Sequence, residues 1–182
     1  MGKAAMPSKA VLFTGIMLQS SVDLDEIIAL LTGKFGPIDR VFGPVQFLHT
    51  EYYENEMGRN LQKAYCVFER YIEREELPMV KIYTNSIEER YANNGMRTVN
   101  IDPGYITRDK LVLASTKDFY HRIYVSQGIF AEVTLHYRKG AFRFFSWTYA
   151  DYKDPGVLKI AEAARARLVK SIRDGLPPKS AG

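Results

Sequence analysis

The segment from residue 100 to residue 138 constrains the fold most, because it contains two strand-like runs separated by a glycine turn. Side chains alternate between the faces of a strand, so a one-residue slip reverses all of them. His121, Ile123 and Val125 share one face before the turn. Pairing Val125 with Ile129 places these three residues on the same face as the apolar residues that follow the turn. It leaves residues 126–128 as a three-residue loop in which Gly128 has a left-handed backbone conformation. That apolar set, expected on one face, is Ile129, Ala131, Val133, Leu135 and Tyr137.

This register places Arg122 directly across from Glu132, with Tyr124 beside Phe130. A second hairpin follows, in which Lys139 and Gly140 form a two-residue turn. Its pairs are Tyr137 with Phe142, Leu135 with Phe144, and His136 with Arg143, and its continuation puts Trp147 across from Glu132. One sheet face is then expected to display Arg122, Glu132, Thr134, His136, Arg143, Phe145 and Trp147.

The length of 182 residues predicts one domain, over residues 10–174, with a disordered leader at 1–9 and a frayed tail at 175–182. No apolar run approaches the roughly 20 residues that cross a bilayer, and the first residues lack a signal-peptide core. We therefore expect a cytoplasmic protein that does not enter membranes. The single cysteine, Cys66, excludes an internal disulfide and lies in a strand-like run, so we expect a buried thiol.

The first half of the chain alternates strand and helix patterns. Residues 10–18 are continuously apolar, which predicts a central strand covered on both faces. Asp23 caps a helix that ends at Gly36 and Pro37. A strand at 41–47, broken at Gly43 and Pro44, suits a sheet edge. Residues 50–58 fit a loop or a short helix.

A strand at 63–72 and a helical region from Pro78 to residue 93 follow, with a second helix capped at Thr84 as an alternative. After a strand at 98–101, Asp102, Pro103 and Gly104 have turn composition. Residues 107–116 fit either helix or strand. An aromatic loop at 147–155 precedes an amphipathic helix at 157–173.

The element order predicts an α+β fold with a mixed or antiparallel sheet. Its first half is compatible with a ferredoxin-like βαββαβ unit. The two β-hairpins and the C-terminal amphipathic helix extend that unit.

The charged cluster before the first hairpin is the best candidate site. Lys117 and Arg122 are suited to hold a phosphate or a carboxylate, with Asp118 or His121 as proton carrier. The alternative is a hairpin entry held by ion pairs, with His121 facing the core. Arg122 and Glu132 form either a cross-strand pair or, with Trp147, the wall of a pocket.

The remaining candidates each have a structural alternative. Asp102 is either a turn residue or a ligand carboxylate. The carboxylates of Glu51, Glu54 and Glu56 suit a hard cation, or belong to a solvated loop. The aromatic residues Trp147, Tyr149 and Tyr152 form a stacking platform or pack the last helix. His49 and His136 lack zinc-site spacing, so no metal site is predicted.

Several long motifs mark a family resemblance: N-I-D-P-G-Y-I-T from residue 100, K-L-V-L-A-S-T-K-D-F-Y-H-R-I-Y from 110, G-I-F-A-E-V-T-L-H-Y-R-K-G from 128 and W-T-Y-A-D-Y from 147. Through them the chain resembles the bacterial family catalogued as domain of unknown function 4416. The resemblance suggests a nucleotide, GTP in particular, as a ligand. The chain contains no G-x-x-x-x-G-K-[ST] loop, so a nucleotide would bind by another geometry.

Three functions are compatible with these observations. The first is a binding module for an anionic ligand, a nucleotide or an RNA end, centred on Lys117, Arg122 and Arg138. The second is an enzyme on a phosphorylated or nucleotide substrate that uses Asp102, Asp118, His121 and Glu132; its cofactor is unknown. The third is an interaction module whose aromatic face binds a partner or a second copy. Binding ranks first because no complete catalytic constellation is present.

Overall fold

The computed structural model describes residues 2–47, 57–93 and 95–175. In these ranges the strands are β1 Ala10–Gln19, β2 Ile38–Gln46, β3 Leu61–Ile72, β4 Val99–Ile106, β5 Lys110–Ser115, β6 Ile123–Ser126, β7 Ile129–Arg138 and β8 Ala141–Phe144. The helices are α1 Leu24–Phe35, α3 Leu77–Arg90 and α4 Pro155–Arg173, with short 3-10 turns η2 Arg74–Glu76 and η3 Ala150–Lys153. None of these helices has the length and apolarity that crossing a membrane requires.

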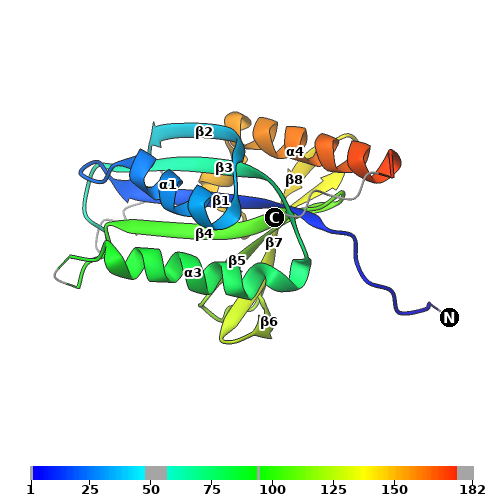
Figure 1. The fold of residues 1–182 in the computed structure, drawn as a ribbon, viewed down its shortest axis with the longest axis horizontal. Helices are drawn as coiled ribbons and strands as arrows, with labels where there is room; N and C mark the ends of the chain where they lie inside the picture. The colour runs from blue at the N-terminus through cyan, green and yellow to red at the C-terminus, as the bar shows by residue number, and fades with distance from the viewer. Residues whose placement is uncertain (1, 48–56, 94, 176–182) are drawn as a thin grey trace.

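The strands form one open antiparallel sheet with helices on both of its faces (Figure 1). Their order is β2-β3-β1-β4-β5-β7-β6, and β8 pairs with β7. The predicted α+β class is therefore confirmed.

The central strand β1 is buried on both faces, as its apolar run predicted. Leu12 and Ile16 belong to a core that includes Ile27 of α1, whereas Val11 and Phe13 belong to the core under α4. Alternate residues of one strand thus serve two separate hydrophobic layers.

The boundaries of α1 follow the predicted capping residues, whereas α3 ends at Arg90, before the predicted end at residue 93. The Asp23 side chain accepts the backbone N–H of Asp25 at 2.9 Å, and α1 ends at Gly36 with a φ of 86°. Asp154, which was not predicted as a cap, accepts the backbone N–H of Gly156, and α4 begins at Pro155 rather than at the predicted residue 157. The helix α3 is continuous through Thr84, so the alternative second helix does not form.

The first half of the chain contains two crossovers of the same kind. The connection from β1 through α1 to β2 passes over β3, and the connection from β3 through α3 to β4 passes over β1. The strand β2 lies at the sheet edge, with an irregular register between Phe42 and Val45, as predicted. The ferredoxin-like assignment of this half stays a prediction.

The expectation of a turn at Asp102, Pro103 and Gly104 is wrong. All three residues lie inside β4, where Asp102 pairs with Gly15 of β1. Glycine at position 104 allows β4 to lie close to the backbone of β5, since a Cβ on Gly104 would come within 2.2 Å of the carbonyl oxygen of Val112. Residues 107–116, which fitted either a helix or a strand, contain the strand β5.

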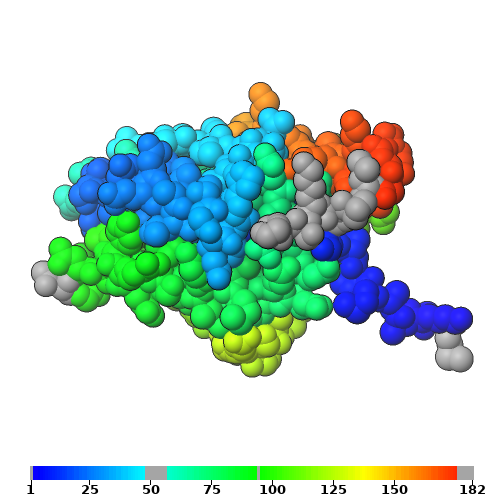
Figure 2. All heavy atoms as spheres, in the orientation of Figure 1, coloured from blue at the N-terminus to red at the C-terminus, as the bar shows by residue number. Residues whose placement is uncertain are grey.

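The first hairpin has two of the expected pairs, Tyr124 with Phe130 and Ile123 with Ala131. The three-residue loop is wrong: Ser126 pairs with Ile129, and the register slips between Tyr124 and Ser126. The turn consists of Gln127 and Gly128, with φ angles of 52° and 76°. Two positive φ angles match the twist of the strands, which favours this tighter turn. The hairpin projects from the lower edge of the molecule (Figure 2), and its Ile123 is 75% exposed.

The second hairpin has the predicted pairs, among them His136 with Arg143. Two other expectations fail. A bulge between β5 and β7 sends Val133 and Leu135 to opposite faces, so the apolar residues of β7 do not share one face. The strand β8 ends at Phe144, so Trp147 does not continue it opposite Glu132.

Candidate functional site

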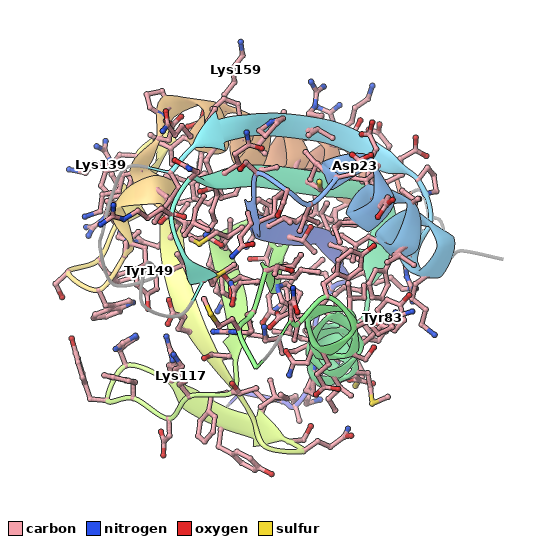
Figure 3. The ribbon with its side chains drawn as sticks, turned by 90° about the vertical axis from the view of Figure 1, so that its left-hand side faces the viewer. Asp23, Tyr83, Lys117, Lys139, Tyr149 and Lys159 are labelled. Carbon is pink, nitrogen blue, oxygen red and sulfur yellow. The ribbon has the colours of Figure 1, made fainter. Side chains whose placement is uncertain are left out.

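The strands β4 and β5 diverge, and a cavity of about 340 Å³ lies where they separate. In the part of the chain that the structure describes, β4 and β5 pair at three positions: Gly104 with Leu113, Tyr105 with Val112, and Ile106 with Leu111. Residues 99–103 of β4 pair with β1 but have no counterpart on β5. The cavity is lined by Asn100 and Asp102 from β4 and by Ser115 from β5. Figure 3 views this end of the molecule, with Lys117 and Tyr149 among its labelled residues.

Two side chains of α3 replace the missing strand beside β4. Glu88 accepts the backbone N–H of Ile101 at 2.8 Å, and Lys81 donates to the carbonyl oxygen of Ile101 at 2.7 Å. Both side chains are buried, and their charged groups lie 3.3 Å apart. The backbone N–H and carbonyl groups of Ile101, which no strand pairs with on this side of β4, therefore both have hydrogen-bond partners.

A continuous series of polar contacts runs along β4, and we call it the β4 wall. From Glu88 it passes to Arg97 at 3.2 Å, and from Arg97 to Asn100 at 3.0 Å. Asn100 donates to Asp102 at 3.0 Å, and Asp102 lies 3.8 Å from the ammonium of Lys63. Acidic and basic groups alternate along this wall, so its charges are compensated locally.

The β4 wall ends in a buried ion pair between Lys63 of β3 and Asp151 of η3, at 2.9 Å. The hydroxyl of Tyr65 also donates to Asp151, at 2.7 Å. Burial acts to lower the pKa of Lys63, but the attraction of Asp151 and Asp102 outweighs it and raises the pKa above its usual 10.5. Burial acts to raise the pKa of Asp151, but its contacts with Lys63 hold that pKa below 3.8. Both groups are therefore charged at neutral pH.

The opposite side of the cavity, the β5 wall, is formed by Ser115, Lys117, Arg122 and Glu132. Arg122 donates through Nε to Glu132 at 2.8 Å, and through Nη1 to Ser115 at 2.9 Å and to the carbonyl oxygen of Lys117 at 3.0 Å. Burial acts to lower the pKa of Arg122, whereas its bond to Glu132 more than compensates and raises it. The guanidinium is fixed in place by three acceptors.

His121 and Trp147 lie behind the β5 wall. The Nε2 of His121 is 3.1 Å from Glu132, and its ring stacks on Trp147 with centroids 5.4 Å apart. The indole N–H of Trp147 donates to the carbonyl oxygen of Val133 at 3.0 Å. Glu132 also accepts from Thr134 at 3.2 Å. These contacts hold Glu132 in position beneath Arg122.

The cavity brings six of the candidate residues together: Asp102, Lys117, Arg122, Glu132, Tyr149 and Tyr152. His121 and Trp147 reach the site only through Glu132 and through each other. Asp118 is exposed and outside the cavity lining. Arg138 is also exposed, at the far end of β7, where it pairs with Ala141.

Several lining residues were missed by sequence reasoning: Lys63, Lys81, Glu88, Arg97, Asn100, Ser115 and Asp151. A signal for one of them exists, because Asn100, like the predicted candidate Asp102, alternates with apolar Val99 and Ile101 in a buried strand. Polar residues on one face of a central strand indicate a polar cavity. The contribution of α3 has no comparable signal, since Lys81 and Glu88 resemble ordinary helix-surface residues.

The described residues contain no group of three or more acidic, histidine or cysteine side chains that could hold a metal ion. The acidic candidates Glu51, Glu54 and Glu56, and also His49, lie outside the described residues. Cys66 is buried as expected, and burial raises its pKa to about 12. A thiol with this pKa is a poor nucleophile at neutral pH.

Comparison with known proteins gives one match. The model of the family described as domain of unknown function (DUF4416) matches residues 8–168. No curated protein and no solved structure matches the chain significantly.

Proposed function

This chain belongs to the family of domain of unknown function 4416, and we propose that it binds a small anionic ligand in the cavity between β4 and β5. The observation that carries the proposal is the composition of the β5 wall. There the side chain of Arg122 donates to the hydroxyl of Ser115, Lys117 adds a second basic residue to the lining, and Glu132 is the acidic member of this wall. This wall has an excess of positive charge, and its groups are typical ligands of a phosphate or a carboxylate.

The contacts of Arg122 favour binding. Its side chain is 7% exposed and is held by Glu132, Ser115 and the backbone of Lys117. A guanidinium that is already ordered loses little conformational entropy when an anion binds. The surrounding acceptors therefore prepare Arg122 for a ligand.

The dimensions favour a small molecule over an RNA end. A volume of about 340 Å³ is at the lower end of the roughly 300–1,000 Å³ that is usual for ligand pockets. Arg138, which would extend a nucleic-acid surface, lies away from the cavity. A cytoplasmic location, where phosphorylated metabolites are abundant, accords with this proposal.

The charges favour a ligand with one anionic group. Among the described residues, five basic side chains line the cavity (Lys63, Lys81, Arg97, Lys117 and Arg122) and five acidic ones (Glu88, Glu89, Asp102, Glu132 and Asp151). A triphosphate such as that of GTP would bring several negative charges close to these carboxylates. A monophosphate or a carboxylate can be confined to the β5 wall.

A thermal-shift screen tests the proposal, with inorganic phosphate, sugar phosphates, nucleoside mono- and triphosphates and short RNA as probes. A ligand at 100 times its Kd stabilises the native state by about 2.7 kcal/mol, which raises the melting temperature by several degrees. We expect a shift with monophosphates in the wild type and a loss of that shift in Lys117→Gln.

Lys159→Gln is the matched control, because Lys159 is an exposed lysine of α4 far from Lys117 (Figure 3). Absence of any shift, or an equal shift in both variants, contradicts the proposal.

A further inference from the structure

The two walls of the cavity differ in charge, and we infer from this difference that the ligand is a sugar monophosphate. Its phosphate would bind at the β5 wall and its hydroxyl groups at the β4 wall. This inference rests on the proposed function and adds the chemical class of the ligand.

The β4 wall offers donors and acceptors side by side. Asn100 contributes an amide, Asp102 a carboxylate, and Lys63 an ammonium 3.8 Å from that carboxylate. The contacts that the structure gives Asp102 all involve one oxygen, Oδ2. Its side chain is 27% exposed, so the carboxylate remains accessible. A sugar hydroxyl can donate to Asp102 and accept from Asn100 or Lys63 at the same time.

The charge balance of the β4 wall disfavours a second phosphate or an ammonium group at the end of the ligand that binds there. Lys63 and Arg97 are matched there by Asp151, Asp102 and Glu88. A second phosphate would face these carboxylates, and an ammonium group would face the two cations. Neutral hydroxyl groups satisfy both kinds of partner without adding charge.

Calorimetric titration tests the inference with ribose 5-phosphate, ribose and inorganic phosphate as probes. We expect ribose 5-phosphate to bind at least about tenfold tighter than inorganic phosphate, as hydrogen bonds to charged groups imply. Ribose is expected to bind much more weakly than either. GMP is expected to bind no tighter than ribose 5-phosphate, because the cavity is small.

The variant Asp102→Asn separates hydroxyl recognition from general electrostatics. Removal of a negative charge near an anion site favours every anion, so a purely electrostatic role predicts tighter binding of both phosphate and ribose 5-phosphate. Recognition of hydroxyl groups by Asp102 predicts opposite changes. Phosphate should bind equally or more tightly, and ribose 5-phosphate should bind about tenfold more weakly. Asp109→Asn, at an exposed carboxylate outside the cavity, should change neither.

The outcomes distinguish the two proposals. If phosphate binds in a manner that requires Lys117 and ribose adds no affinity, the inference about the sugar is wrong and the proposed function stands. The inference is also wrong if Asp102→Asn tightens both ligands or if GMP binds tenfold tighter than ribose 5-phosphate. If no phosphate-bearing probe binds the wild type, both proposals are wrong.

Discussion

Glu88 of α3 accepts the backbone N–H of Ile101 in β4 at 2.8 Å, at a position where a neighbouring strand would normally bind. Lys81 completes the replacement at the carbonyl oxygen of the same residue. Without these bonds, the divergence of β4 and β5 would leave buried backbone groups unpaired, which is costly. The helix α3 thus allows the sheet to open and a cavity to form within it.

Truncation of Glu88 should destabilise the protein strongly. Glu88→Ala leaves the buried ammonium of Lys81 without its carboxylate and the N–H of Ile101 without an acceptor. We expect a loss of about 3–5 kcal/mol in the free energy of unfolding, measured by urea denaturation. The neighbouring Glu89→Ala, at an exposed residue, should change it by less than about 0.5 kcal/mol. Equal effects of the two variants would contradict the role given to Glu88.

The ion pair of Lys63 and Asp151 should make stability depend on pH at both extremes. The lowered pKa of Asp151 contributes stability above pH 3.8, and this is lost as the pH falls through the folded-state value. The raised pKa of Lys63 contributes stability below pH 10.5, and this is lost as the pH rises through the folded-state value.

The variant Asp151→Asn tests this linkage. Its stability deficit relative to wild type should be largest near neutral pH and should shrink below about pH 3.8, where the unfolded carboxyl protonates. Chemical denaturation at a series of pH values measures the deficit. A deficit that stays constant into strong acid would show that the charge of Asp151 contributes nothing.

Two glycines should respond in opposite directions to substitution by alanine. A Cβ on Gly104 would lie 2.2 Å from the carbonyl oxygen of Val112, so Gly104→Ala should destabilise the protein by about 1–3 kcal/mol or more. Gly33 is a helical residue, and beyond its chain neighbours and the backbone of its own helix no described heavy atom lies within 4 Å of an added Cβ. Gly33→Ala should stabilise by about 0.5–1 kcal/mol. Thermal unfolding of both variants measures the difference, and a neutral Gly104→Ala would refute the close strand approach.

Neutralisation of Glu132 should weaken the β5 wall. Glu132→Gln keeps the shape of the side chain but removes the charge that faces Arg122, whose side chain is 7% exposed. We expect a loss of about 2–4 kcal/mol in the free energy of unfolding, since one partner of a buried pair is left. Asp118→Asn, at an exposed position, should be nearly neutral in denaturant titrations. If Glu132→Gln left the free energy of unfolding unchanged, water would already solvate Arg122, and the role given to Glu132 would be wrong.

Local patterns predicted much of the fold. The apolar run of β1, the Asp23 cap and the pairing of His136 with Arg143 all depend on residues close in sequence or on strand parity. The failures in the first hairpin and in β7 occur where parity is interrupted, whereas the turn expected at Asp102, Pro103 and Gly104 was inferred from composition alone. A bulge beside Val133 adds one residue, and no apolar pattern reveals which strand absorbs it.

Most of the β5 wall was predicted, whereas Asp102 was the one residue of the β4 wall that the sequence marked as a candidate. Lys117, Arg122 and Glu132 are close along a hairpin, so strand register brings them together. The other wall joins Lys63 with Asp151, two residues far apart in the chain. Their meeting depends on the packing of η3 against β3 and on the divergence of β4 from β5, which a single sequence does not encode as a local pattern.

Amide chemical-shift mapping by NMR, during titration with inorganic phosphate and then ribose 5-phosphate, tests the central claim most directly. We predict that phosphate shifts the signals of Ser115 and Lys117, and that ribose 5-phosphate also shifts those of Asn100 and Asp102. Shifts confined to the exposed basic residues of α4, such as Lys159, or no shifts at all, would contradict a ligand site between β4 and β5.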